Sequence, residues 1–406
     1  MRLITINALV ALLVLLRLAS AGWAQSAATT IIDVRPGAPN PVETLVIHSE
    51  ILDEDRSIYV QLPEGYDRSD AVYPVLYVMD GEWLFDLANA HARYYAYDEV
   101  TDITLPRMIV VGLENTDRDR NYAPTPNSGI EYDFPTAGGA DNFIRFLELE
   151  LIPLIESRYK AAPLRGIVGW SNSGLFANYV ATANQDLFDM YLCISPAVWW
   201  DQDMIYERFE DLEFDRPKRF VYSLGTNEEG GYVYESTSRL LERFAQEPVP
   251  NMHVSHFKIE GVGHTWGVAS AMNHGLQDLF VEYIAPGEVI NAGLDAVEAY
   301  YMDLSRQWRY TVEPPAKVLH GVAFNLWDEA PEEAIKVLQE AVSNDVDDST
   351  SLYYLGLLHR NIGATEQAVE YLNLAIEAEL RKTVPNEVNR RTFASSLEKL
   401  ETAPLN

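Results

Sequence analysis

Short, largely apolar runs recur between residues 73 and 259, and they limit the fold of this chain more than any other feature. They span residues 73–79, 108–113, 166–169, 190–194, 219–224 and 253–259. A strand that lacks apolar–polar alternation is typical of a parallel sheet whose two faces are both covered. Helical spacing of apolar residues from about Asp141 to Tyr159 supplies one covering helix, whereas residues 30–63 alternate as strands exposed on one face. The pattern predicts an α/β fold with a mostly parallel sheet flanked by helices.

The pattern of apolar residues changes after residues 285–287, Ala-Pro-Gly. From there on it indicates helix almost throughout. Apolar positions 334, 338 and 341 recur at 368, 372 and 375, which is the period of a tetratricopeptide repeat. We therefore predict three segments: a signal peptide at 1–24, an α/β domain at 25–285 and an all-α tetratricopeptide-like domain at 286–406. Two repeats rarely stand alone, so flanking helices are expected to cap them, or the array to dock on the first domain.

The first residues and the charge of the chain indicate where it acts and on what. Arg2 followed by an apolar run and small residues near 19–24 is typical of a secretory signal, so we expect a periplasmic or secreted protein. The formal net charge of −31 makes nucleic acid an improbable partner. The single cysteine, Cys193, excludes an internal disulfide and is expected to pack in the core.

The strongest chemical signal is the turn Gly169-Trp170-Ser171-Asn172-Ser173, which joins a buried strand to a helix. Such a turn exposes a serine hydroxyl but crowds the backbone, so the positions two before and two after the serine must be small. Gly169 meets this requirement. Ser173 is small, although glycine is more usual there. We predict that Ser171 is a nucleophile.

A serine nucleophile needs a base and an acid, which follow it along the chain in this fold. His264 lies in a glycine-rich loop just after a strand, and it is the preferred base among the histidines that follow Ser171. The loop after residues 219–224 holds Glu228 and Glu229, either of which can orient an imidazole. Glu228 is preferred and Glu229 is the alternative.

The remaining site predictions concern groups that would contact the substrate. The backbone amides of Asn172 and Glu82 are expected to form an oxyanion hole. Trp170, Trp199 and Trp200 are expected to line a substrate pocket, with ordinary packing as the alternative for the last two. Two arginines in the loop after residue 113, Arg118 and Arg120, are predicted to tie that loop to acidic neighbours, with binding of an anionic substrate group as the alternative. The sequence predicts no metal site and no cofactor.

Several stretches jointly resemble the putative esterase family of α/β-hydrolases, which includes esterase D, feruloyl esterases, mycolyltransferases and enterochelin esterases. They cover about residues 45–284 and include the segments at 62–66, 73–81, 115–120, 138–140, 150–153, the serine turn and 195–200. The resemblance implies ester hydrolysis through an acyl-enzyme, with Ser171 as nucleophile and His264 as base. Some relatives use a serine–histidine pair alone, so the resemblance leaves the acid open.

Three hypotheses follow. The first is a serine carboxylesterase acting on a small-molecule ester. The second is an acyltransferase that uses the same residues, which only product analysis would separate from the first. The third is a catalytically inactive hydrolase fold whose helical repeats bind a partner; the presence of all three loops argues against it. In each case the helices could bind a protein or peptide, mediate self-association, or cover part of the mouth of the active site.

Overall fold

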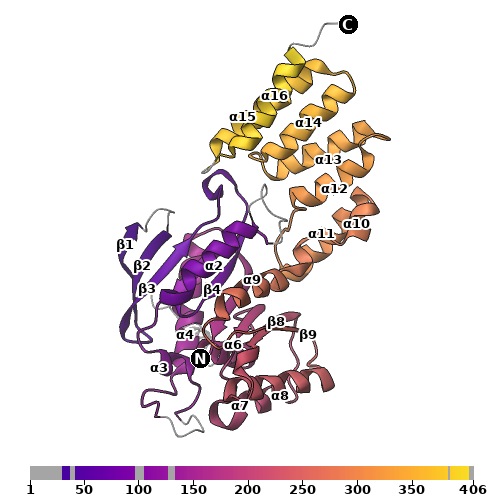
Figure 1. The fold of residues 1–406 in the computed structure, drawn as a ribbon. Helices are drawn as coiled ribbons and strands as arrows, with labels where there is room; N and C mark the ends of the chain where they lie inside the picture. Colours follow the sequence, from indigo (N-terminus) through magenta and orange to yellow (C-terminus); the bar gives the residue numbers. More distant parts are fainter. Residues whose placement is uncertain (1–29, 37–41, 97–104, 127–132, 383–384, 402–406) are drawn as a thin grey trace, which may run out of the picture.

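The fold is taken from a computed structural model that describes residues 30–36, 42–96, 105–126, 133–382 and 385–401. Within these ranges nine strands form one sheet, in the order β1-β2-β3-β5-β4-β6-β7-β8-β9 (Figure 1). The strands are β1 Thr30–Pro36, β2 Val42–Ser49, β3 Glu54–Gln61, β4 Tyr73–Val78, β5 Ile109–Leu113, β6 Ala161–Trp170, β7 Met190–Ile194, β8 Lys218–Gly225 and β9 Met252–Ile259. The predicted signal peptide lies outside the described residues.

The sheet has an antiparallel part and a parallel part. Strands β1, β2, β3 and β5 pair antiparallel, whereas β5, β4, β6, β7, β8 and β9 pair parallel. Every residue of β4, β5 and β7 is buried, as the absence of alternation predicts. The expected mostly parallel sheet is confirmed.

Helices cover both faces of the sheet because successive strand residues point to opposite sides. Tyr77 and Ile167 face a cluster that includes residues of α4 (Ala140–Phe146), α6 (Asn172–Ala183) and α8 (Tyr232–Gln246). Their neighbours Val78 and Val168 face α2 (Gly81–Tyr95) and α9 (Val268–Leu279). Cys193 is fully buried in β7. Two short helices, α3 (Arg118–Tyr122) and α7 (Trp200–Arg208), follow β5 and β7.

The helix expected at about 141–159 is present, but a π-helical segment interrupts it. α4 continues into the π-helical residues Leu147–Leu151 and then into α5, Ile152–Arg158. Pro153 lies at the start of α5 and has no N–H to donate to an earlier turn. Glu150, in the π segment, is buried and accepts hydrogen bonds from Ser49 Oγ at 2.6 Å and from the Ile51 amide at 3.2 Å.

The C-terminal part is all helical, as predicted. Its helices are α10 Gly287–Asn291, α11 Leu294–Trp308, α12 Ala316–Leu326, α13 Pro331–Asn344, α14 Ser349–Asn361, α15 Thr365–Arg381 and α16 Glu387–Glu401. The positions with the 34-residue period are buried between them. A Cβ at Gly356 in α14 would lie 2.8 Å from Leu372 in α15, so a small residue allows these helices to pack closely. Whether the helices are true tetratricopeptide repeats stays a prediction.

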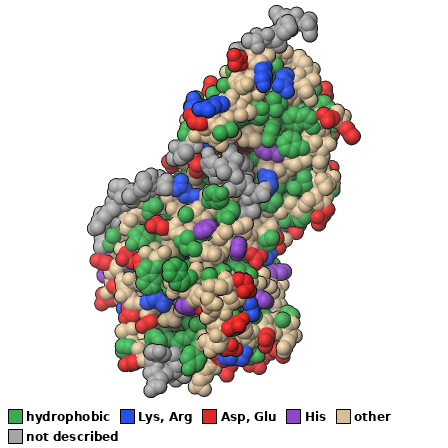
Figure 2. Space-filling view, in the orientation of Figure 1, with side chains coloured by type: hydrophobic (Ala, Val, Ile, Leu, Met, Phe, Trp, Pro, Cys, Tyr) green, Lys and Arg blue, Asp and Glu red, His purple; other side chains and the backbone are tan. Residues whose placement is uncertain are grey.

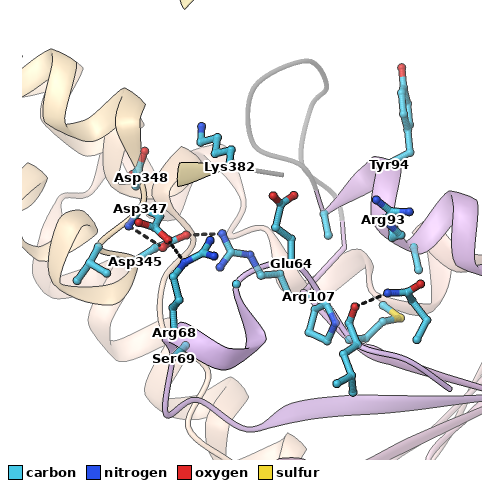
Figure 3. Close-up of a pocket in the computed structure, with 18 of the residues that line it drawn as sticks. Glu64, Arg68, Ser69, Arg93, Tyr94, Arg107, Asp345, Asp347, Asp348 and Lys382 are labelled. Atoms are coloured by element: carbon cyan, nitrogen blue, oxygen red, sulfur yellow. Dashed lines mark hydrogen bonds and ion pairs between the residues drawn. The ribbon is translucent and has the colours of Figure 1, made fainter. Parts of the chain in front are cut away.

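The helical part docks on the amino-terminal edge of the parallel strands. Arg68 pairs with Asp347 at 2.5 Å, and Arg107, just before β5, pairs with Asp345 (Figure 3). A cavity of about 710 Å³ lies beside these pairs. Arg309, just after α11, reaches Asp189 at 2.6 Å, just before β7. Because a chemical site at the ends of parallel strands is expected at their carboxyl edge, these contacts place the helices away from the predicted mouth. The expectation that the array docks on the first domain is confirmed.

The surface agrees with the acidic composition. Asp and Glu side chains are spread over the face seen in Figure 2. Among the described residues, no helix combines the length and the hydropathy needed to cross a bilayer.

Candidate active site

The predicted nucleophile lies on a sharp turn between β6 and α6. Ser171 has φ 59° and ψ −115°, a left-handed region that costs free energy for a residue with a side chain. Its amide donates to the Ile194 carbonyl at 3.0 Å, and its carbonyl accepts from the Ala197 amide at 2.9 Å. A Cβ at Gly169 would lie 2.1 Å from the Ser173 carbonyl oxygen. The backbone therefore requires glycine at 169 and holds the serine at the carboxyl end of the sheet.

The structure pairs His264 with Glu228 rather than with Glu229. His264 Nδ1 lies 2.7 Å from Glu228 Oε2. The other carboxylate oxygen, Oε1, accepts from Ser195 Oγ at 2.7 Å and from the Gly225 amide at 2.9 Å. Glu229 is exposed and accepts instead from Tyr234 Oη at 2.8 Å. Glu228 is thus held on both oxygens, and it orients the imidazole.

The environment keeps Glu228 ionised. Its side chain is only 7% exposed, and this burial alone would raise its pKa. The hydrogen bonds from His264, Ser195 and Gly225 outweigh burial, so the pKa of Glu228 is lowered from its ordinary value. A charged carboxylate beside Nδ1 favours the imidazole tautomer whose Nε2 can accept a proton.

His264 lies beside the serine turn. Its backbone carbonyl accepts from Trp170 Nε1 at 3.1 Å, and the two rings are 5.3 Å apart. Among the hydrogen bonds of the described residues there is none between Ser171 Oγ and His264. Catalytic hydrogen bonds of this kind often tighten only when substrate is bound.

The two predicted oxyanion amides open neighbouring helices. Asn172 is the first residue of α6, and Glu82 is the second residue of α2. Amides in the first turn of a helix lack a partner within the helix and favour negative charge. The Trp83 and Leu84 amides donate to the Asp80 carbonyl, both at 2.9 Å, whereas the Glu82 amide has no backbone partner among the described residues. Since β4 and β6 pair in parallel, both helices begin at the same edge of the sheet.

A cavity of about 750 Å³ adjoins His264 and has aromatic walls. Phe134, Trp199 and Tyr232 line it together with Glu228 and Glu229. Trp199 is half-buried and lines the cavity, and its contact with substrate stays a prediction. Trp200 is fully buried and donates to Thr125 Oγ1 at 3.1 Å, so it packs behind the pocket instead of lining it.

On the other side of His264, Trp170 makes an edge contact with Trp83, whose side chain is 57% exposed. Phe134, Tyr232 and Trp83 are not among the site residues predicted from the sequence. In the sequence, each of these three is only an aromatic residue in a segment that follows a strand. Aromatic residues that pack in the core occur in the same kind of segment, so this pattern does not distinguish the two roles.

Three carboxylates lie near the serine turn and the aromatic cavity. They belong to Glu82, Asp119 and Glu229, and we call them the acidic rim. Asp119 accepts from Asn172 Nδ2 at 3.3 Å, Glu82 accepts from the Asn115 amide at 3.1 Å, and Glu229 lines the cavity. The nearby cation Arg118 is paired with Asp80. Lys258 is attracted electrostatically to Glu229 and Glu260.

The predicted structural role of the two arginines is confirmed. Arg118 donates to both oxygens of Asp80, at 2.8 and 3.0 Å. Arg120 donates to both oxygens of Glu54, each at 2.8 Å. Within the described residues no group of three or more His, Cys, Asp or Glu side chains is arranged to hold a metal ion.

The sheet order and the strand–turn–helix at Ser171 define an α/β-hydrolase fold. Residues 49–242 match the family model described as putative esterase. The match supports activity on ester bonds. It also confirms the resemblance drawn from the sequence.

Individual proteins are similar to this chain in sequence or in fold. The ferri-bacillibactin esterase BesA of Bacillus subtilis (strain 168) is 26% identical over 214 residues, which are 48% of this chain and 74% of that protein. An IroE-like serine hydrolase from Shewanella oneidensis has a similar fold, with a TM-score of 0.64, 24% identity, and coverage of 75% of this chain and 98% of its own. An uncharacterised protein from Capnocytophaga ochracea has a TM-score of 0.58 at 17% identity and covers 89% of this chain and 100% of its own. That coverage exceeds the α/β part, so the shared fold extends into the C-terminal helices.

Proposed function

We propose that the protein is a serine esterase that hydrolyses a small-molecule carboxylic ester through an acyl-enzyme. Ser171 is the nucleophile, His264 the general base and Glu228 the acid that orients it. The amides of Asn172 and Glu82 bind the oxyanion. The observation that carries this proposal is the contact between the buried Glu228 and the half-buried His264, whose Oε2 and Nδ1 atoms are 2.7 Å apart, beside the strained turn that bears Ser171.

The reaction follows from these positions. Ser171 Oγ bonds to the ester carbonyl carbon while His264 Nε2 takes the hydroxyl proton. The carbonyl oxygen becomes an oxyanion that the two amides bind. Collapse breaks the bond to the alcohol, which leaves with the proton from His264. A water molecule then attacks the acyl-enzyme with the same proton transfers, releasing the acid and restoring Ser171.

The aromatic cavity supports an ester with an apolar or aromatic group as substrate. Trp199 lines the cavity, and Trp170 and the catalytic imidazole lie in contact at one side. The relatives include an esterase named for ferri-bacillibactin, so siderophore esters belong in the first substrate panel. Acyl transfer to an alcohol would use the same residues and differs only in the acceptor of the acyl group.

The test is hydrolysis of short-chain 4-nitrophenyl esters by the parent protein, Ser171→Ala and His264→Ala. We expect activity in the parent and its loss in both variants, with similar circular dichroism spectra for all three. Mass spectrometry of products, with and without added alcohol, separates hydrolysis from acyl transfer. Undiminished activity in Ser171→Ala would refute the proposal.

Two further features of the sequence belong to this proposal. The signal-like segment at 1–24 supports export of the mature enzyme to the periplasm or medium, which N-terminal sequencing of the secreted protein would check. The helical part, with its 34-residue period, supports a tetratricopeptide-like domain that binds a protein or peptide partner or mediates self-association. The contacts described above dock the helical part on the amino-terminal edge of the parallel strands. They do not involve the carboxyl edge, where Ser171 and His264 lie.

A further inference from the structure

A buried polar cluster lies behind the serine turn, centred on the carboxylate of Asp80. This side chain is fully buried, and its backbone is left-handed with φ 54°. Arg118 donates to both carboxylate oxygens, at 2.8 and 3.0 Å. Asn115 Nδ2 donates to Oδ1 at 2.6 Å, and Ser173 Oγ donates to Oδ2 at 2.6 Å. A buried carboxylate with this many donors is held in one orientation.

On one side, the cluster holds the serine turn. Ser173 Oγ accepts from the Trp170 amide at 2.7 Å, and Arg118 Nη2 donates to the Trp170 carbonyl at 2.8 Å. Trp170 and Ser173 flank Ser171 and Asn172 in the chain. Both backbone polar groups of Trp170, the residue before the nucleophile, are therefore bonded to the cluster.

On the other side, the cluster holds the start of α2. Asp80 precedes this helix, and its carbonyl accepts from the Trp83 and Leu84 amides, both at 2.9 Å. Its own amide donates to Tyr122 Oη at 3.1 Å. Asp80 is two residues before Glu82, so its position decides where the Glu82 amide points.

Arg118, which bonds both oxygens of Asp80, is also surrounded by aromatic rings. The guanidinium carbon of Arg118 lies 5.7 Å from the Trp83 ring centroid, 5.8 Å from that of Trp170 and 5.9 Å from that of Tyr122. A planar guanidinium can stack on rings and bond a carboxylate at both oxygens at once, which an ammonium group cannot do. Lysine at this position would keep the charge but lose the fixed geometry.

We propose that Asp80, Arg118 and Ser173 are positioning residues that set the separation between the oxyanion-hole amides of Asn172 and Glu82. The inference rests on the proposed function. The two amides belong to segments about 90 residues apart in sequence, and the cluster bridges them through one carboxylate. Oxyanion donors act only when they lie about 2.7–3.1 Å from the developing charge, so a small shift of either segment lowers the rate.

This role accounts for the serine at position 173, where the nucleophile turn usually has glycine. Glycine there would remove one donor from Asp80 and the acceptor of the Trp170 amide. The steric requirement of the turn is met at Gly169, whose missing Cβ makes room for the Ser173 carbonyl. The Ser173 side chain points instead to the cluster, where it is fully buried.

The experiment compares Ser173→Ala and Arg118→Lys with the matched control Arg120→Lys. Arg120 is on the same short helix and also bonds both oxygens of a carboxylate, but that carboxylate is Glu54. Each variant is assayed for kcat and KM on 4-nitrophenyl butyrate and for inhibition by a short alkyl boronic acid, whose adduct with serine places an oxygen in the oxyanion hole. Thermal melts report folding.

We expect Ser173→Ala and Arg118→Lys to lower kcat by about tenfold or more, because a misplaced oxyanion donor costs up to about 10²-fold. KM should change by less than about threefold, and boronic acid affinity should fall in parallel with kcat. Arg120→Lys should retain kcat and boronic acid affinity even where its melting temperature falls. Ser173→Ala removes a single hydroxyl and decides the question if Arg118→Lys does not fold.

The proposal is overturned if folded Ser173→Ala keeps kcat and boronic acid affinity, or if Arg120→Lys loses as much of both. The Ser171→Ala variant, measured beside these, separates the two levels of inference. If Ser171→Ala is as active as the parent, the proposed function fails. If Ser171→Ala is inactive and the cluster variants behave like the parent, only the positioning role fails.

Discussion

Glu228→Gln changes one atom of the proposed triad and tests its acid directly. Oε1 of Glu228 accepts two hydrogen bonds, from Ser195 Oγ and from the Gly225 amide. In the glutamine variant the carbonyl oxygen must occupy this place, so the amide NH₂ faces His264 Nδ1. The imidazole can then only accept at Nδ1, which puts its proton on Nε2. That tautomer cannot take the proton of Ser171.

The expected loss follows from this geometry. The corresponding change in a serine protease triad lowers kcat by about 10⁴-fold. His264 is 34% exposed, so water can partly stabilise the imidazolium, and we expect a loss of about 10³-fold, which is about 4 kcal/mol of transition-state stabilisation. KM should change little, because Glu228 stabilises the transition state rather than bound substrate.

The assay is the pH–rate profile of kcat/KM on 4-nitrophenyl butyrate, with Glu229→Gln as the matched control. The Glu229 side chain accepts from Tyr234 Oη and makes no hydrogen bond to His264, so its variant should lose far less activity on this neutral ester than Glu228→Gln, although Glu229 lines the cavity. If folded Glu228→Gln keeps more than a tenth of the parent activity, Glu228 is not the acid of the triad. Equal losses in the two variants would refute that role as well.

Three other outcomes follow from the structure. Gly169→Ala should lower kcat by about 10²-fold because its Cβ would lie 2.1 Å from a backbone oxygen, whereas Gly263→Ala, with nothing within 4 Å of its Cβ, should not. Asp189→Asn should lower the free energy of unfolding in urea by about 3–5 kcal/mol, since it leaves Lys218 buried without its partner, and exposed Asp186→Asn should not. Burial alone would raise the pKa of Asp189, but Lys218, Arg216 and Arg309 lower it. The stability that Asp189 contributes should therefore be present above the pKa of the carboxyl group in the unfolded chain and be lost as pH falls through its pKa in the folded protein. Asp189→Asn should weaken this dependence of the free energy of unfolding on pH. The acidic rim should slow hydrolysis of a 4-nitrophenyl hemisuccinate relative to the neutral butyrate, and added NaCl should narrow the difference; a ratio independent of salt would contradict this.

Much of the scaffold could be predicted from the sequence because buried parallel strands leave a clear apolar pattern. The six predicted strands correspond to β4–β9. Their ends agree with the structure to within one or two residues, except that β6 begins at Ala161 and not at residue 166. Ser171 and His264 could be proposed from the sequence because this fold places chemistry at the carboxyl ends of strands, in chain order. Docking of the helices was one of the sequence-based expectations, but the edge on which they dock could not be predicted, since pairs such as Arg107–Asp345 join positions that share no local pattern.

Side-chain direction in loops was the other limit, and adjacent residues show why. Glu228 and Glu229 are chemically alike and one position apart, yet the 3-10 turn Thr226–Glu228 directs only the first toward Ser195 and His264. Trp199 lines the pocket, whereas Trp200 is fully buried behind it. Neighbouring side chains diverge wherever the backbone turns, and composition carries no record of which one faces inward.

Ser173 extends the same point to a departure from a motif. From the sequence, serine at that position only satisfied a size limit. In the structure the size limit acts on Gly169, through the carbonyl of residue 173, while the side chain of residue 173 faces the other way and bonds Asp80 and Trp170. A motif position can therefore carry a steric demand on its backbone and an independent polar role for its side chain. Substituting alanine, which meets the first and removes the second, is what separates them.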